Sequence, residues 1–174
     1  GFARFVDPHT IMVSFADGSE IALSGERFVI AVGTVPHRPP DIDFDDPDIL
    51  DSDEIAEVPR MPRSLTVVGA GVIGIEYATI FSALDVAVTV IEPRQTLLDF
   101  VDREIIEDFV HQLRDRGVRL QLGAAVKAVA RCDDKIVATL EDGRTVASDM
   151  LLYCAGRIGA THKLGLDDCG IDCD

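Results

Sequence analysis

The segment Leu65-Thr-Val-Val-Gly69-Ala-Gly71-Val-Ile-Gly74-Ile-Glu76 decides the fold of this 174-residue chain. Residues 65–68 form a short apolar run rich in β-branched side chains, which is typical of a buried parallel strand. Three glycines follow in the spacing Gly-x-Gly-x-x-Gly, and a second apolar run, 86–91, ends at Glu92. A strand, a glycine-rich turn, a helix and a second strand ending in an acid together indicate a dinucleotide-binding unit.

Each residue of the turn has its own physical role in this pattern. Gly69 ends the strand, where a tight turn needs a residue that is free in φ. Gly71 lacks the Cβ that would keep a pyrophosphate away from the backbone, and Gly74, one helical turn later, allows the helix to lie close to the strand. The backbone amides near Val72 and Ile73 face the phosphates at the positive end of the helix dipole. We therefore predict that these five residues form the pyrophosphate site.

The second strand ends in two residues that bear on the choice of cofactor. Glu92 follows Gly74 by 18 residues, and an acid at this place can accept hydrogen bonds from an adenosine ribose, which favours NAD. Arg94 comes two residues later, and a guanidinium there could instead pair with the 2′-phosphate of NADP. The sequence leaves both NAD and NADP open as cofactors.

The composition is that of a globular protein, and it excludes several kinds of partner. Hydrophobic residues make up 47% of the chain and charged residues 27%, with a formal net charge of −15. This charge leaves no basic stripe for nucleic acid and disfavours an anionic membrane surface. No apolar stretch approaches the roughly 20 residues of a membrane span, and no signal-like start is present. We therefore expect a cytoplasmic protein that contacts neither nucleic acid nor membrane.

The side chains that commonly perform chemistry form no cluster along the sequence. The cysteines lack Cys-x-x-Cys spacing and a neighbouring set of histidines, which argues against a zinc site or a dithiol centre; they are Cys132, Cys154, Cys169 and Cys173. The four histidines are scattered among loop and helix-surface positions. We therefore assign no catalytic residue and no metal ligand.

A weak internal repeat organises the rest of the chain. Apolar segments between turn signals predict a three-stranded meander at 2–6, 11–15 and 20–23, followed by a buried strand at 28–32 that ends at Gly33. The same arrangement recurs at 125–130, 136–140 and 144–147, followed by a strand at 150–154 that leads to Gly156. The repeat suggests two related nucleotide-binding domains, of which only the second is complete.

The segment between the repeats completes the fold prediction. An amphipathic helix is expected at 103–116, with Gly117 as its stop, and a strand at 118–122. The predicted fold is an α/β, doubly wound, Rossmann-like parallel sheet with an inserted β-meander. Residues 37–62 are rich in proline and acid, and we interpret them as an exposed connection whose charges are solvated.

The pattern resembles the two-dinucleotide flavoprotein reductases, a family that includes lipoamide dehydrogenase, glutathione reductase, mercuric reductase and the soluble pyridine nucleotide transhydrogenases. The resemblance rests on the glycine-rich segment and on Val29-Ile-Ala-Val-Gly33, Asp51-Ser-Asp-Glu54 and Tyr153-Cys-Ala-Gly156-Arg157. It implies that 1–36 is the end of a first FAD-domain segment, that 63–157 is the NAD(P) domain, and that 158–174 returns to the FAD domain. We accordingly interpret the chain as a piece of a longer protein, flanked by partial FAD-domain β elements.

Within the family, the transhydrogenase branch is the most similar. Gly156-Arg-Ile-Gly159-Ala-Thr161 has Gly159 where the dithiol reductases usually have Pro, although Ala160 departs from the Asn common in both groups. The resemblance implies that the full-length protein carries FAD and moves a hydride between NADPH and NAD through the flavin. One domain must then accept both nucleotides in turn, a requirement that fits Glu92 beside Arg94.

The resemblance also bears on two further residues and on the isolated chain. It places Glu76 near the point where nicotinamide meets flavin, and it adds Gly156 to the cofactor site. We expect the chain on its own to bind nicotinamide dinucleotides without FAD and without turnover, and the full-length protein to be a homo-oligomer.

Two alternatives stay open at this point. The first is a lipoamide dehydrogenase-like disulfide reductase, for which a Cys-x-x-x-x-Cys before Gly1 would decide. The second is a non-catalytic module that senses NADH, for which an extended apolar patch or an appended effector segment would be expected.

Overall fold

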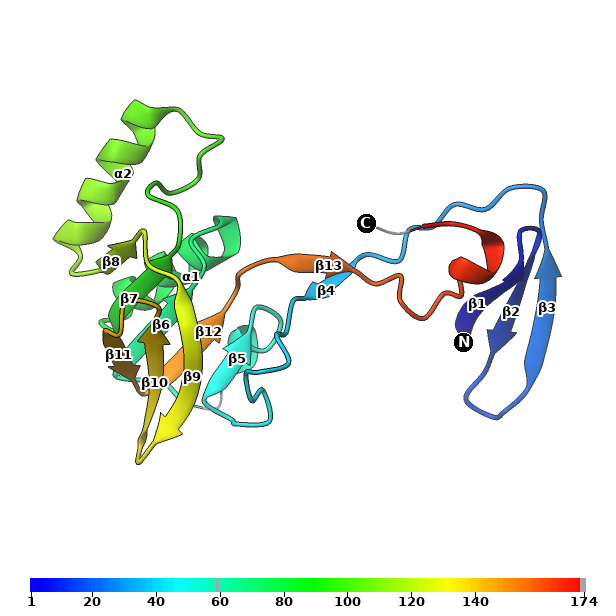
Figure 1. Cartoon of the computed structure of the whole chain (residues 1–174), viewed down its shortest axis with the longest axis horizontal. Coiled ribbons are helices and arrows are strands. Elements are labelled where there is room, and N and C mark those ends of the chain that lie inside the picture. Colours follow the sequence, from blue (N-terminus) through cyan, green and yellow to red (C-terminus); the bar gives the residue numbers. More distant parts are fainter. Residues whose placement is uncertain (59, 173–174) are drawn as a thin grey trace. The chain divides into compact units, whose positions relative to one another are not determined.

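The computed structural model describes residues 1–58 and 60–172, and its larger unit, Pro36–Arg157, is built on a five-stranded sheet (Figure 1). All four strand pairings in this sheet are parallel. The strand order is β5 (Ile49–Asp51), β12 (Met150–Tyr153), β6 (Ser64–Val68), β7 (Ala87–Glu92) and β8 (Arg119–Leu122). The predicted α/β fold with a parallel sheet is confirmed.

Both faces of this sheet are covered, because side chains on a strand alternate between its two faces. Leu65 and Val67 of β6 belong to a core shared with helices α1 (Val72–Ala83) and α2 (Arg103–Asp115). Val68 of the same strand belongs to a second core, shared with the predicted meander. The meander consists of β9 (Val126–Cys132), β10 (Lys135–Leu140) and β11 (Thr145–Ser148), which pair in the order β11-β10-β9. The sheet is therefore the middle of three layers.

The ends of α2 follow from its sequence. Asp102 caps the helix, since its carboxylate accepts a hydrogen bond from the backbone N–H of Glu104 at 2.9 Å. At the other end Gly117 adopts a φ of +83°, and its N–H donates to the carbonyl of Arg114 at 2.9 Å. The predicted glycine stop is confirmed.

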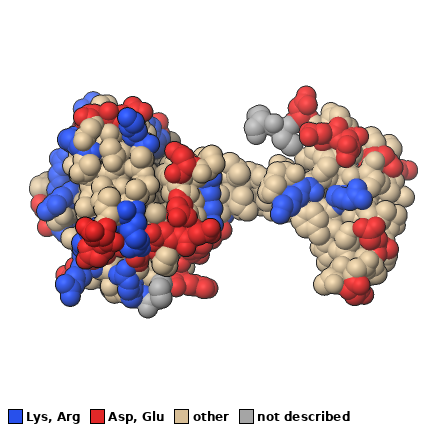
Figure 2. All heavy atoms as spheres, turned by 60° about the horizontal axis from the view of Figure 1, so that its bottom comes forward, with Lys and Arg blue, Asp and Glu red and all other residues tan. Residues whose placement is uncertain are grey.

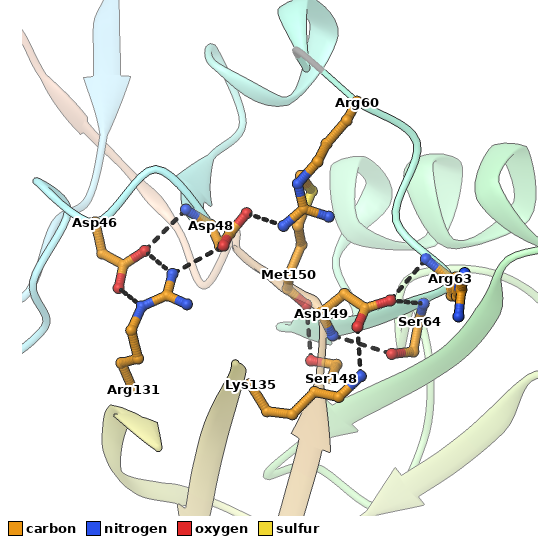
Figure 3. A network of polar contacts seen from close by, with 10 residues as sticks. All are labelled: Asp46, Asp48, Arg60, Arg63, Ser64, Arg131, Lys135, Ser148, Asp149 and Met150. Atoms are coloured by element: carbon orange, nitrogen blue, oxygen red, sulfur yellow. Dashed lines mark hydrogen bonds and ion pairs between the residues drawn. The ribbon is translucent and has the colours of Figure 1, made fainter. Parts of the chain in front are cut away.

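The acidic segment before the glycine-rich turn differs from its prediction. We expected an exposed connection with solvated charges, but β5 lies at the edge of the parallel sheet, and a 3-10 helix (Ile55–Glu57) follows it. Asp48 and Asp51 are buried, and Asp48 pairs with Arg60 and Arg131 (Figure 3). The prediction holds for the exposed Asp41, Asp43 and Asp45. It was wrong for Asp48 and Asp51, because arginines outside the local pattern neutralise them: Arg60 and Arg131 pair with Asp48, and Arg38 pairs with Asp51.

A second polar cluster ties the meander to the sheet (Figure 3). The carboxylate of Asp149 accepts hydrogen bonds from the backbone N–H groups of Arg63 at 2.7 Å and Ser64 at 3.1 Å. The same carboxylate pairs with the ammonium of Lys135 on β10. Asp149 therefore joins three segments: the start of β6, the start of β12 and the meander.

The smaller unit, Gly1–Val35 with Ile158–Asp174, contains the first predicted meander. Its strands are β1 (Phe2–Asp7), β2 (Thr10–Ser14) and β3 (Glu20–Ser24), paired in that order. Phe5, Leu164 and Leu166 form its small core, beside the 3-10 helix Asp167–Cys169. β4 (Thr34–Pro36) and β13 (Arg157–Gly159) pair with each other where the chain passes between the units.

The strand predicted at 28–32 is absent. This segment has no regular structure, and Val29 is 92% exposed. A β-strand needs a neighbouring strand to satisfy its backbone hydrogen bonds, and among the described residues no strand pairs with this segment. The apolar pattern was recognised correctly, but burial does not follow from it.

The surface of the larger unit carries mixed charge. Figure 2 shows basic and acidic side chains interspersed over the drawn face of this unit, at the left of the picture, with no basic stripe. Within the described residues, no helix combines the length and the apolar character that a membrane crossing requires. Cys132, Cys154 and Cys169 are free thiols, while Cys173 lies outside the described residues.

Candidate functional site

The glycine-rich turn has the geometry that its sequence predicts. Gly69 ends β6 with a φ of +101°, a conformation that L side chains rarely adopt. A Cβ on Gly74 would lie 2.0 Å from the carbonyl oxygen of Gly69 and 2.8 Å from the Sγ of Cys154. Gly74 therefore allows α1 to lie directly on the turn.

The start of α1 opens onto a cavity. Gly71 is the N-cap residue, it makes no side-chain capping hydrogen bond, and a Cβ there would meet nothing within 4 Å. Gly71, Val72, Ile73 and Gly156 line a cavity of about 250 Å³ at this point. Four predicted site residues thus meet around the helix N-terminus, where unpaired amides and the helix dipole favour an anion.

Three residues without a predicted site role also line this cavity: Ser52, Cys154 and Arg157. The guanidinium of Arg157 donates to Asp53 at 2.7 Å and to the hydroxyl of Ser52 at 2.9 Å. Its charge is therefore already partnered, and the helix N-terminus is the main attraction for a phosphate. The signal for these residues lay in the segments Asp51–Glu54 and 153–157, which we had taken only as marks of a family.

The thiol of Cys154 packs against the backbone of the glycine-rich turn. It lies 3.2 Å from the carbonyl oxygen of Val68 and 3.4 Å from that of Gly69. Burial, and to a smaller extent the nearby carboxylate of Glu92, raise the pKa of this thiol to about 12. Cys154 thus stays protonated near neutral pH and acts as a packing residue and weak donor.

Glu92 lies at the carboxyl end of β7, and its side chain is only 3% exposed. One carboxylate oxygen accepts a hydrogen bond from the N–H of Ala70 at 2.7 Å, inside the glycine-rich turn. The other accepts from the backbone N–H of Arg94 at 3.0 Å and from its Nε at 2.8 Å. Burial alone raises the pKa of Glu92, but these hydrogen bonds outweigh burial and leave the pKa below its ordinary value. Glu92 is therefore a buried, ionised group that also fixes the turn.

Arg94 holds Glu92 from the solvent side, and its own side chain is 48% exposed. Its Nη2 lies 3.3 Å from Glu92, and its Nη1 lies 3.6 Å from a carboxylate oxygen of Asp99. Sequence reasoning missed the proximity of Asp99, because it depends on the conformation of the loop between β7 and α2. The two predicted cofactor-selecting residues are thus in direct contact, with a second acid beside them.

A further cavity, of about 520 Å³, lies next to these residues at the ends of β7 and β8. Pro93, Gly123 and Ala124 line one part of it, and Glu141 and Asp142 of the meander line another. The N–H of Gly123 donates to the carbonyl of Arg94 at 3.0 Å, which joins the two strand ends. Ligands of open parallel sheets bind outside the carboxyl ends of the strands, which is where this cavity lies. The sequence carried no motif for this cavity.

Glu76 lies one turn into α1, apart from the phosphate cavity. Its side chain is exposed and forms no hydrogen bond or ion pair with another described residue. It lines an open apolar groove of about 580 Å³ between α1 and α2, together with Val72, Ile80 and Ile105. The structure therefore places Glu76 beside the N-terminus of α1, on a surface that Val72 also reaches.

The sequence of the chain matches one family model along nearly its whole length. Residues 3–174 match the model of the pyridine nucleotide-disulphide oxidoreductases. The chain belongs to this family. The family is named for pyridine nucleotides, and the parallel sheet with its glycine-rich turn is the part of this chain that suits such a nucleotide.

Curated relatives and solved structures agree with this assignment. The chain is 43% identical over 173 residues to a soluble pyridine nucleotide transhydrogenase of Mycobacterium bovis, covering 99% of this chain and 37% of the relative. It is 41% identical over 174 residues to a protein of the same name from Shigella boydii, again covering 37% of the relative. The chain thus spans little more than a third of the length of these relatives.

Two solved structures have the same fold. LpdA from Mycobacterium tuberculosis has a TM-score of 0.89 at 30% identity, covering 98% of this chain and 38% of that protein. The HOCl-induced flavoprotein disulfide reductase RclA from Escherichia coli has a TM-score of 0.87 at 28% identity, covering 100% of this chain and 39% of that protein. Sequence identity is therefore higher to the transhydrogenases than to these two proteins.

Proposed function

We propose that the unit Pro36–Arg157 binds NAD(H) and NADP(H) in turn, as the nicotinamide-nucleotide part of a FAD-dependent transhydrogenase. The observation that carries the proposal is the open helix N-terminus at Gly71, which lies at the same sheet edge as the contacting pair Glu92 and Arg94. The first feature suits a pyrophosphate, and the second suits an adenosine ribose with or without a 2′-phosphate.

The assignment of residues follows the order of groups along a dinucleotide. The amides of Val72 and Ile73, with Gly71 and Gly156, hold the pyrophosphate. Gly69 and Gly74 shape the turn, and Glu76 in the apolar groove orients the nicotinamide end. Glu92 accepts the ribose hydroxyls of NAD(H), while Arg94 pairs with the 2′-phosphate of NADP(H).

The reaction itself depends on groups that the chain positions. When bound, flavin and nicotinamide supply the hydride chemistry, and the protein holds them in line and keeps water away. FAD would be held largely by parts of the full-length protein beyond the third that this chain spans. We place the activity in the cytoplasm, because the curated relatives are named soluble transhydrogenases.

The transhydrogenase is preferred to a disulfide reductase on two grounds. Identity is 41–43% to the proteins named transhydrogenases, against 28–30% to the solved LpdA and RclA chains. Gly159 also stands where the dithiol reductases usually have Pro.

The test is a hydride-transfer assay on the full-length protein, with NADPH as donor, an NAD analogue as acceptor and no disulfide substrate. Rapid transfer is expected. Activity that appears only when a disulfide substrate such as lipoamide is added would replace the transhydrogenase with a disulfide reductase. Titration of the same protein with NADH and with NADPH by calorimetry tests the nucleotide site separately from turnover.

A further inference from the structure

We propose that Asp99 is a specificity-determining residue of this site, because it competes with the 2′-phosphate of NADP(H) for the guanidinium of Arg94. The inference rests on the proposed function, namely that nicotinamide dinucleotides bind at this sheet edge. It adds a third residue to the pair Glu92 and Arg94 that the sequence indicates. Asp99 is expected to shift the binding preference toward NAD(H) and away from NADP(H).

The position of Asp99 is set by the loop that carries it. Leu97, two residues earlier, is buried, and Leu98 adopts a φ of +43°. The N–H of Val101 donates to the carbonyl of Leu98 at 2.8 Å, which closes a tight turn around Asp99. A loop anchored in this way holds the carboxylate on the same side as Arg94, 3.6 Å from its Nη1.

Arg94 can move away from Glu92 without leaving the carboxylate bare of hydrogen-bond donors. Apart from the guanidinium, the Glu92 carboxylate accepts two backbone hydrogen bonds, from Ala70 at 2.7 Å and from Arg94 at 3.0 Å. These donors stay in place when the Arg94 side chain moves, so each carboxylate oxygen keeps one hydrogen-bond donor. The side chain of Arg94 is half exposed, and that of Asp99 is 60% exposed. The guanidinium of Arg94 can therefore exchange between anionic partners, and the anions around it decide where it lies.

The two nucleotides place different demands on this arrangement. The ribose hydroxyls of NAD(H) are neutral donors and need only a carboxylate acceptor, which Glu92 offers. A 2′-phosphate carries a charge of nearly −2 at neutral pH, and it must draw Arg94 toward itself while lying near Asp99. Asp99 therefore weakens the binding of the 2′-phosphate in two ways. It holds the guanidinium of Arg94, and its own negative charge repels the phosphate.

The test compares the dissociation constants of NADPH and NADH for the full-length protein and its Asp99→Asn variant at low salt. An exposed ion pair is worth little, so we expect NADPH to bind about two- to fivefold more tightly to the variant, with NADH changed far less. The gain should shrink at high ionic strength, because salt screens exposed charges.

Two control variants make the result specific. Asp99→Glu keeps the charge and should preserve the wild-type preference. Asp134→Asn removes one exposed acid from the hairpin between β9 and β10, so it reports the general effect of lowering the net charge of −15. An Asp99→Asn gain no larger than that of Asp134→Asn would overturn the inference.

The remaining outcomes separate the inference from the proposed function. If the wild-type protein binds NADH and NADPH but Asp99→Asn shifts both constants by the same factor, the role of Asp99 is refuted while the nucleotide site stands. If the wild-type protein binds neither nucleotide, the proposed function fails, and the inference fails with it.

Discussion

The variants Gly71→Ala and Gly74→Ala should separate ligand approach from packing within the glycine-rich turn. Each adds one methyl group, and the two positions are three residues apart. At Gly71 the φ of −70° and ψ of −178° suit any residue, and the new Cβ meets nothing within 4 Å. At Gly74 the new Cβ lies 2.0 Å from a backbone oxygen, a distance that requires the helix or the turn to move.

The expected stability changes follow from these contacts. Gly71→Ala should change the free energy of unfolding by no more than about 0.5 kcal/mol, as for a substitution without a steric conflict. Gly74→Ala overpacks the contact between α1 and the glycine-rich turn and should cost about 1–3 kcal/mol, after part of the cost is offset by the better helix propensity of Ala. For a chain of this size, a loss of this magnitude lowers the melting temperature by roughly 2–10 °C.

The expected effects on NADH binding run in the opposite order to the effects on stability, with Gly71→Ala as the more damaging variant. In the proposed site, the methyl group of Gly71→Ala would occupy the space through which a pyrophosphate approaches the amides of Val72 and Ile73. Loss of one charge-assisted hydrogen bond, worth about 1.5–3 kcal/mol, weakens NADH binding by about tenfold to a hundredfold. Calorimetric titration and thermal melting of both variants measure the two effects. A Gly71→Ala protein that binds NADH as tightly as the wild type would refute the assignment of the cavity to the pyrophosphate.

Three further predictions concern the charged groups. Arg94→Ala should weaken NADPH binding at least about tenfold through loss of the charged contact to the 2′-phosphate, with a much smaller effect on NADH; equal losses would contradict the role of Arg94. Asp149→Asn should lower the free energy of unfolding by about 1–2 kcal/mol in urea titration, a value reduced because its partner Lys135 is 41% exposed; an unchanged midpoint would show that the contacts of Asp149 do not stabilise the fold. Acid should destabilise the larger unit, because hydrogen bonds from Lys135 and from Arg131 lower the pKa of Asp149 and Asp46 below the ordinary 3.8; their contribution is complete above that value and is lost as the pH falls through the lower folded values, so a urea midpoint that is equal at pH 7 and pH 3 would exclude it.

The elements that could be predicted from the sequence are those whose signals are local. The glycine-rich turn combines a β-branched strand, fixed glycine spacing and a helix start within 12 residues, so its geometry follows from the conformational needs of each position. The helix α2 was equally predictable, because Gly117 and the apolar periodicity lie in the same segment. The two meanders were found because turn residues separate strands that pair with their neighbours in sequence.

The features that were missed depend on partners distant in sequence. β5 has only three residues within an acidic stretch, and its burial relies on pairing with β12, about 100 residues later. Asp48 is buried because Arg131 reaches it from the meander. The prediction for the segment 28–32 was wrong in the other direction. Its apolar residues indicated a strand, but no described strand pairs with it. In each case the deciding contact is tertiary, and the local pattern does not encode it.

The contacts of Glu92 lead us to expect that the proposed cofactor preference depends on the neighbours of this acid more than on the acid itself. One of its carboxylate oxygens accepts a hydrogen bond from the N–H of Ala70, in the turn of the proposed pyrophosphate site, and the other accepts from Arg94. We therefore expect a change of Glu92 to disturb the proposed pyrophosphate and ribose positions together and to weaken the binding of both nucleotides. Arg94 and Asp99 are exposed, and the contacts of the described residues link Arg94 to the turn through Glu92 and Asp99 to Arg94. We therefore expect changes there to alter the response to a 2′-phosphate alone. We therefore expect the proposed site for NAD(H) and NADP(H) to be adjustable at the exposed charges of Arg94 and Asp99, while the buried carboxylate of Glu92 keeps the turn unchanged.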